Sequence, residues 1–103
     1  MNSETAVGRL YALAQESRLA VFRLLVQRGP EGLPAGEIAT RLKVPQATMS
    51  FHLKELSHAG LLKSRQEGRF IYYAPDFKAM QGLIAYLTEN CCAESSCGSG
   101  ECS

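Results

Sequence analysis

The 103-residue sequence predicts a mainly α-helical domain that carries a β-hairpin before its last helix. Apolar residues recur every three or four positions through most of the chain, which is the period of an amphipathic helix. Two short runs over residues 61–65 and 70–74, rich in Leu, Ile, Phe and Tyr, indicate strands instead. Near residue 90 the composition changes, and four cysteines follow. We therefore expect one folded domain over residues 1–89 and a flexible cysteine-rich tail over residues 90–103.

Two helices are expected before residue 30. The first covers residues 4–14 with Ser3 as its N-cap, and the second covers residues 17–28. Gly29 and Pro30 end the second helix, because glycine tolerates a left-handed cap and proline cannot continue a helix. The apolar positions of the first helix are Val7, Leu10, Tyr11 and Leu13. The expected core stripe of the second helix consists of Leu19, Phe22, Leu25 and Val26.

The next two helices are short and joined by a tight turn. One covers residues 34–42, with Pro34 at its first helical position, and the other covers residues 46–59 and ends at Gly60. The residues expected to form their shared apolar seam are Ile38, Leu42, Met49, Leu53 and Leu56. This arrangement is a helix-turn-helix.

The hairpin and a last helix complete the expected architecture. Residues 66–69 join the two strands, and Gly68 supplies positive φ in that loop. Asp76 caps a helix over residues 77–88, whose apolar positions include Phe77, Met80, Leu83, Ile84 and Leu87. This stripe either packs within one subunit or forms a subunit interface together with the first helix. The order α-α-α-α-β-β-α, mainly α with a β-hairpin wing, is that of a winged helix-turn-helix.

The helix over residues 46–59 carries side chains suited to the DNA major groove. With Leu53 buried, a rotation of about 100° per residue turns Thr48 and Phe51 outward. Amide and hydroxyl groups pair with base edges, and an apolar group can touch a thymine methyl. Phe51 either enters the groove or packs on a neighbouring loop. The candidate DNA contacts are Gln46, Thr48, Ser50, Phe51 and Lys54 in the helix and Arg65 and Arg69 in the hairpin.

The distribution of charge is weaker evidence for a nucleic-acid partner than the side chains of the helix over residues 46–59. Residues 41–69 hold six basic and two acidic residues, a net charge of +4, within a chain whose net charge is +1. A local basic segment suits nucleic acid, although such segments are also common on solvated faces. Arg65 and Arg69 suit the DNA backbone or, alternatively, solvent. His52 is expected to contact phosphate or to anchor its helix by a hydrogen bond, and we favour the second.

Four segments resemble the ArsR/SmtB family of metalloregulatory repressors: residues 14–25, 44–56, 59–62 and 67–73. The Ser-x-His-Leu-x-x-Leu pattern beginning at Ser50 and the Gly-Arg pair of the wing are the most specific parts. The resemblance implies a homodimeric winged-helix repressor that leaves its operator when metal binds. It also implies that the first and last helices form the dimer interface.

The chain departs from the family at both usual metal sites. Arsenic sensors with a Cys-Val-Cys motif carry it in the region matching residues 31–37, which contain no cysteine here. A zinc-type site on the last helix needs Asp and His pairs, and residues 77–89 contain no histidine. The chain instead resembles a subgroup of arsenite-responsive members with a Cys-Cys…Cys cluster after the last helix.

The cysteines Cys91, Cys92, Cys97 and Cys102 are the remaining soft ligands. Thiolates favour thiophilic ions over Mg²⁺ or Ca²⁺. As(III) and Sb(III) take three thiolates in a pyramid, and we assign these ligands to Cys91, Cys92 and Cys97. Cys102 is a possible fourth or substitute ligand, and four thiolates also suit zinc, cadmium or lead. Oxidation, for example to a Cys92–Cys97 disulfide, is a further alternative.

The sequence therefore predicts a cytoplasmic repressor of an arsenic-resistance operon, with operator DNA, a second copy and a metalloid ion as partners. No enzyme is expected, because the sequence around Cys97 offers neither an Arg nor a helix start to activate a thiol. A metal-buffering or chaperone protein is a weaker alternative, since it has no use for a basic winged helix. No apolar run approaches the about 18 residues that cross a membrane, and no secretory signal begins the chain.

Overall fold

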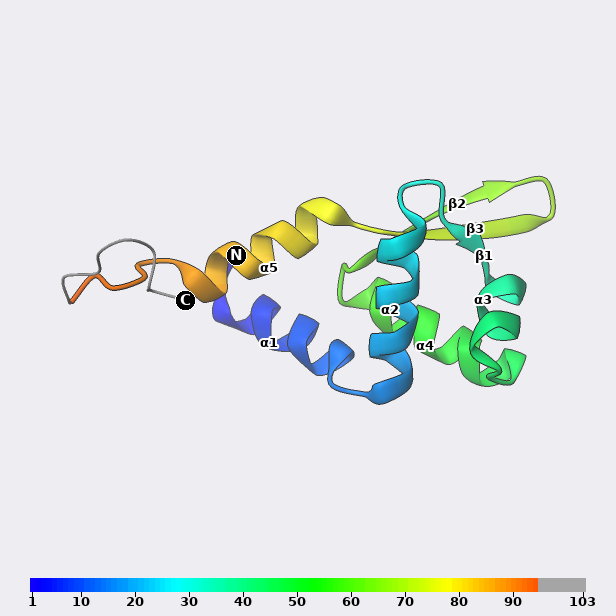
Figure 1. Ribbon diagram of the computed structural model, residues 1–103, viewed down its shortest axis with the longest axis horizontal. Helices are drawn as coiled ribbons and strands as arrows, with labels where there is room; N and C mark the ends of the chain where they lie inside the picture. Colours follow the sequence, from blue (N-terminus) through cyan, green and yellow to red (C-terminus); the bar gives the residue numbers. More distant parts are fainter. Residues whose placement is uncertain (95–103) are drawn as a thin grey trace.

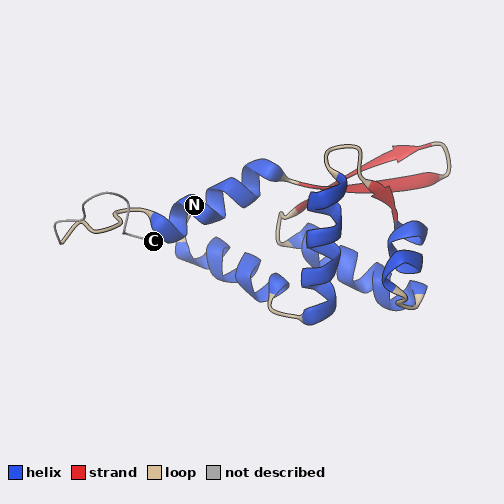
Figure 2. Ribbon diagram, viewed as in Figure 1, coloured by secondary structure: helices blue, strands red, loops and turns tan. Residues whose placement is uncertain are grey.

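The computed structural model describes residues 1–94, which form five helices and a three-stranded antiparallel sheet. The elements are α1 (Ser3–Leu13), α2 (Glu16–Arg28), β1 (Leu33–Pro34), α3 (Ala35–Leu42), α4 (Gln46–His58), β2 (Leu62–Glu67), β3 (Phe70–Pro75) and α5 (Phe77–Thr88). Helices α1 and α5 lie together at one end of the molecule, and the β2–β3 hairpin projects at the other (Figures 1 and 2). The predicted mainly helical fold with a hairpin wing is confirmed.

Local capping signals set several helix ends. Asp76 caps α5 as predicted, because its Oδ1 atom accepts a hydrogen bond from the Ala79 amide at 3.1 Å. The prediction of Ser3 as the first N-cap is wrong: α1 begins at Ser3, and the Oδ1 atom of Asn2 accepts from the Thr5 amide at 2.8 Å. Gln15 caps α2 in the same way, accepting from the Arg18 amide at 2.8 Å.

Strand β1 is absent from the sequence prediction. Leu33 and Pro34 pair with Tyr73 and Tyr72, so that β3 lies between β1 and β2. Pro34 is therefore extended, with ψ of 151°, and precedes α3 rather than occupying its first helical position. A two-residue strand is too short to show an alternating pattern, and an edge strand tolerates proline. Gly32 is required here, because a Cβ atom on it would lie 2.4 Å from the carbonyl oxygen of Tyr73.

The wing is longer than predicted. Strand β2 continues through Glu67, which pairs with Phe70, so the loop predicted over residues 66–69 is reduced to Gly68 and Arg69. Gly68 has a φ of 65°, which confirms the predicted need for positive φ. The tighter turn places Arg69 at the tip of the hairpin.

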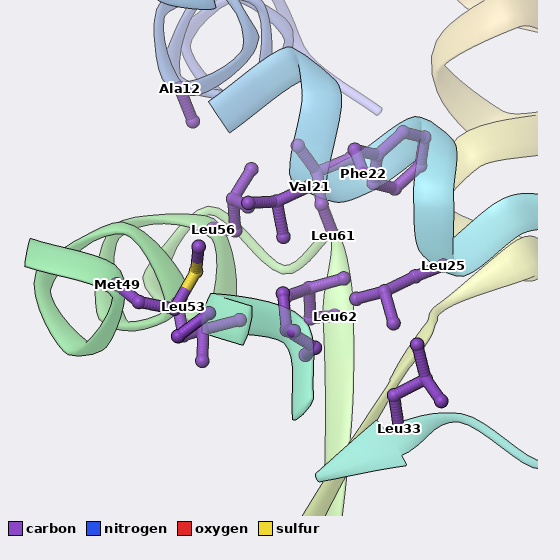
Figure 3. Close-up of a cluster of buried hydrophobic side chains, with 12 residues drawn as sticks. Ala12, Val21, Phe22, Leu25, Leu33, Met49, Leu53, Leu56, Leu61 and Leu62 are labelled. Atoms are coloured by element: carbon purple, nitrogen blue, oxygen red, sulfur yellow. The ribbon is translucent and has the colours of Figure 1, made fainter. Parts of the chain in front are cut away.

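A buried apolar cluster fixes α4 against α2, α3 and the base of the wing (Figure 3). Met49, Leu53 and Leu56 of α4 are all buried, as the spacing predicted. The predicted core stripe of α2 is wrong at Leu19, which is exposed, because α2 turns Val21 into the core instead. The largest side chains with almost no exposed surface are Val21, Leu25, Leu33, Ile38, Met49, Leu53, Leu56 and Leu61.

Helices α1 and α5 bury little of their apolar surface within the chain. Small residues make much of the inner face of α1, where Ala6 and Ala12 are buried, and Leu83 is the buried residue of α5. The exposed apolar side chains of the two helices are Val7, Leu10, Tyr11, Ile84 and Leu87. The apolar surplus expected from the sequence is therefore present on the described part of the chain. No helix within residues 1–94 has the length and apolar character needed to span a membrane.

Candidate DNA interface and thiol site

Helices α3 and α4 form a helix-turn-helix whose turn is set by backbone geometry. Lys43 adopts a left-handed conformation, with φ of 54° and ψ of 45°, and the Val44 amide donates to the Ala39 carbonyl at 3.0 Å. Pro45 then precedes the first turn of α4 in an extended conformation. This geometry leaves the N-terminal half of α4, beginning at Gln46, accessible from outside the molecule.

All five DNA-contact candidates on α4 are exposed: Gln46, Thr48, Ser50, Phe51 and Lys54. Phe51 is the clearest case, with 54% of its surface exposed, whereas Leu53 two positions later is 1% exposed. A large aromatic ring on this face is costly in water and favourable in a groove. The predicted outward orientation of α4 is thus observed, and DNA contact by these residues stays a prediction.

His52 fits neither role proposed for it. It is buried, with 6% exposure, and so does not face a phosphate. Its Nδ1 atom has no hydrogen-bond partner in the described part of the chain, so the favoured anchoring bond is wrong at that atom. Burial lowers the pKa of His52, and the nearby positive charge of Arg18 lowers it further. The Phe51 ring lies beside the His52 ring, with centroids 6.1 Å apart.

The two wing arginines differ in their surroundings. Arg65 pairs across the hairpin with Tyr72, and its guanidinium carbon lies 4.8 Å from the ring centroid. Its Nε atom also donates to Glu67 Oε2 at 2.5 Å, which neutralises part of its charge. Arg69 is exposed at the turn, and residues 1–94 provide it with no ion pair. Arg69 therefore presents the less neutralised positive charge at the tip of the wing.

Sequence reasoning missed two apolar residues at the same tip. Phe70 and Ile71 are both exposed, although they belong to strand β3. Their position next to Arg69 makes the end of the wing both basic and apolar. Their exposure could have been predicted from the sequence, because residues directly beside a hairpin turn lie too far from the core to be buried in it.

The thiol site is described in part. Cys91 is exposed and follows α5 by three residues, and its amide donates to the Thr88 carbonyl at 3.2 Å. The Sγ atoms of Cys91 and Cys92 lie 3.4 Å apart. Two sulfurs that each bind one ion at about 2.3 Å lie within roughly 4.6 Å of each other, so this pair fits a shared ion.

The other two thiols, Cys97 and Cys102, lie outside the described residues. Within residues 1–94, no three His, Cys, Asp or Glu side chains are grouped to hold a metal ion. The predicted trio of Cys91, Cys92 and Cys97 therefore stays a prediction.

Comparison with known proteins defines the family. A family model described as a helix-turn-helix domain matches residues 13–65. The transcriptional activator HlyU of Vibrio cholerae is 33% identical over 86 residues, which cover 84% of this chain and 77% of HlyU. The arsenical resistance operon repressor of Bacillus subtilis is 32% identical over 91 residues, covering 88% and 83% of the two chains. The chain belongs to the ArsR/SmtB family of winged-helix transcriptional regulators.

A solved structure extends this assignment. The homodimeric winged helix-turn-helix DNA-binding domain Mb0332 of Mycobacterium bovis, a possible ArsR-family regulator, superimposes with a TM-score of 0.67. It is 25% identical and covers 93% of this chain and 89% of its own. As a member of the ArsR/SmtB family, the chain is a DNA-binding transcriptional regulator. Its relatives include both an activator and a repressor by name, so family membership leaves the inducer and the direction of regulation to be proposed.

Proposed function

We propose that the protein is a homodimeric repressor of an arsenic-resistance operon that leaves its operator when As(III) or Sb(III) binds Cys91, Cys92 and Cys97. The observation that carries this proposal is the pair of adjacent sulfur atoms placed directly after α5. The likeness to the arsenical resistance operon repressor of Bacillus subtilis supports an arsenic-resistance operon as the target. In this proposal, residues 1–89 bind DNA and dimerise, and residues 90–103 sense the metalloid.

Operator recognition divides between α4 and the wing. Gln46, Thr48 and Ser50 lie in the half of α4 that enters the major groove first, where amide and hydroxyl groups meet base edges. Phe51 supplies an apolar contact to a thymine methyl. Lys54, Arg65 and Arg69 bind the phosphate backbone, which adds affinity without sequence information.

The second copy covers the exposed apolar faces of α1 and α5. Helices α1 and α5 themselves lie beside each other at the end of the molecule away from the wing (Figure 1). Full burial of a large apolar side chain contributes about 1.5–3 kcal/mol, so a few such residues per subunit stabilise a dimer. The dimer fixes the distance between its two copies of α4 and so matches two operator half-sites.

Metalloid binding replaces oxygen by sulfur around the ion. Three thiols react with arsenous acid, three As–S bonds form in place of three As–O bonds, and three water molecules leave. The reaction needs the three thiols in their reduced form. Because Cys91 and Cys92 follow α5 so closely, their binding to an ion constrains the end of that helix. A coupling of about 1–3 kcal/mol between the two sites is enough for release.

The test is an arsenite titration of the reduced protein bound to a fluorescent operator duplex selected from random sequences. Wild type is expected to dissociate, whereas Cys91→Ser, Cys92→Ser and Cys97→Ser are expected to stay bound. Cys102→Ser is the matched control and is expected to behave as wild type. Release of a variant lacking the first three thiols would contradict the proposal. X-ray absorption on the arsenite-loaded protein counts the sulfur neighbours of arsenic, and a number other than three would contradict the assigned ligand set.

Thiol oxidation is the second candidate signal, because thiols as close together as those of Cys91 and Cys92 can also be oxidised. An oxidant such as diamide, added without metalloid, distinguishes the two. Release by diamide together with no release of the reduced protein by arsenite would replace the metalloid with a redox signal. Metal buffering without regulation is the weakest alternative, because the chain belongs to a family of DNA-binding regulators.

A further inference from the structure

Arg9 connects three separate parts of the fold. It lies in the middle of α1 and is partly buried. Its Nε atom donates to the carbonyl of Ala59, the residue that caps the C-terminus of α4, at 3.1 Å. Its Nη1 atom donates to the carbonyl of Ala79, in the first turn of α5, at 3.3 Å. One guanidinium group thus binds both the C-terminal end of α4, the helix that carries the candidate DNA contacts, and the first turn of α5, the helix that precedes Cys91.

The two helices have few other links. Helix α1 packs against both α4 and α5, whereas α4 and α5 have little direct contact with each other in the described part of the chain. One backbone hydrogen bond supplements Arg9: the Asp76 amide donates to the Leu61 carbonyl at 2.8 Å. The junction of α4 and α5, formed by Arg9, Ala59, Leu61, Asp76 and Ala79, is therefore narrow.

The junction is also shaped for a guanidinium group. Gly60, directly after the α4 cap, has a φ of 81°, and a Cβ atom on it would lie 3.2 Å from Nη2 of Arg9. The guanidinium therefore packs over a position without a side chain. Its positive charge faces the carbonyl end of α4, where the helix dipole is negative. The planar fork of arginine reaches two carbonyls at once, which the single ammonium of lysine does not do in the same geometry.

We propose that Arg9 is the positioning residue that transmits the state of α5 to the recognition helix α4. When the segment after α5 binds its ligand and α5 shifts, Ala79 moves relative to Ala59, and Arg9 no longer satisfies both carbonyls in their original places. The end of α4 then shifts within its subunit. The exposed side chains of residues 46–54 consequently lose the orientation in which they contact the operator. The proposal rests on the proposed metalloid response, and it assigns the route by which that response reaches the DNA.

The experiment measures operator affinity with and without arsenite, and arsenite binding separately, in reduced wild type, Arg9→Gln, Arg9→Lys and Arg23→Gln. Arg23 is an exposed arginine on α2 and provides the matched control. Wild type and Arg23→Gln are expected to lose about 5–150-fold in operator affinity on binding arsenite. Arg9→Gln is expected to bind arsenite with unchanged stoichiometry, seen in arsenic–thiolate absorbance, and to lose most of that ratio. Arg9→Lys is expected to lie between them.

A wild-type ratio in Arg9→Gln would overturn the proposal. If wild type does not respond to arsenite, the proposed inducer fails, and amide hydrogen exchange then decides the role of Arg9 by itself. Faster exchange confined to the last turn of α4 and the first turn of α5 in Arg9→Gln supports the positioning role. Faster exchange across the whole chain, or no change at the junction, contradicts it. If Arg9→Gln does not fold, Arg9→Lys provides the same two measurements.

Discussion

Replacement of Phe51 by alanine is expected to weaken operator binding and to cost the folded chain less stability than truncation of a core residue. Phe51 keeps 54% of its surface exposed, so roughly half of its apolar contribution has not been realised by folding. Full burial of a phenylalanine side chain contributes at most about 3 kcal/mol. Contact with DNA therefore adds at most about 1.5 kcal/mol through this ring, which is roughly a tenfold change in Kd.

The matched variant is Leu53→Ala on the same helix. Leu53 is 1% exposed and belongs to the buried cluster. Its truncation leaves a cavity and is expected to destabilise the chain by about 2–5 kcal/mol. Phe51→Ala, by contrast, is expected to lower the free energy of unfolding by at most about 1.5 kcal/mol, because only the buried half of the Phe51 surface contributes to the fold.

Two assays separate these effects. Fluorescence anisotropy with the selected operator duplex gives Kd, and urea unfolding followed by circular dichroism gives stability. Both are carried out at one fixed salt concentration, because phosphate contacts make affinity salt-dependent. An unchanged Kd for Phe51→Ala would refute the groove assignment. A large loss of stability would show instead that Phe51 supports the fold, for example through its contact with His52.

Two further predictions concern charge. Arg69→Ala is expected to weaken binding to all duplexes by a similar factor and to reduce the slope of log K against log salt by about 1. The control variant Arg23→Ala is expected to leave that slope unchanged. An unchanged slope for Arg69→Ala would show that the wing tip does not contact DNA. For His52, the folded state binds a proton less readily than the unfolded state, because burial lowers its pKa from 6.5. Stability is therefore expected to be greatest above that value and to decline as pH falls below it, since the unfolded state then takes up more protons. Urea unfolding between about pH 5 and 8 is expected to show a smaller decline in His52→Gln than in wild type, and equal declines would exclude this histidine as the cause.

Local sequence signals accounted for much of the fold. The spacing of Met49, Leu53 and Leu56 determined which face of α4 is buried, and the exposure of Phe51 followed from helical geometry. Asp76 and Gly68 marked their helix start and turn, because an N-cap carboxylate and a positive φ depend on residue type. The surplus apolar residues on α1 and α5 were also visible, since a small domain has too little interior to cover them.

Contacts between distant segments were not predictable in the same way. The short β1 strand exists because Leu33 and Pro34 meet β3, about forty residues later in the chain. The burial of His52 against the core depends on the packing of α2, which also supplies Arg18 beside it. The pairing of β1 with β3 and the packing of His52 near α2 therefore cannot be read from the residue pattern of one segment alone.

Residue types and their spacing were enough to predict a winged helix-turn-helix with thiols gathered after its last helix. Composition and periodicity are properties of residue type, so they can be recognised without coordinates. The tertiary structure decided that Arg9 of α1 joins the end of α4 to the start of α5, through carbonyls 50 and 70 residues away. Backbone carbonyls belong to every residue and leave no signature in the sequence, so the fold alone brings this junction together.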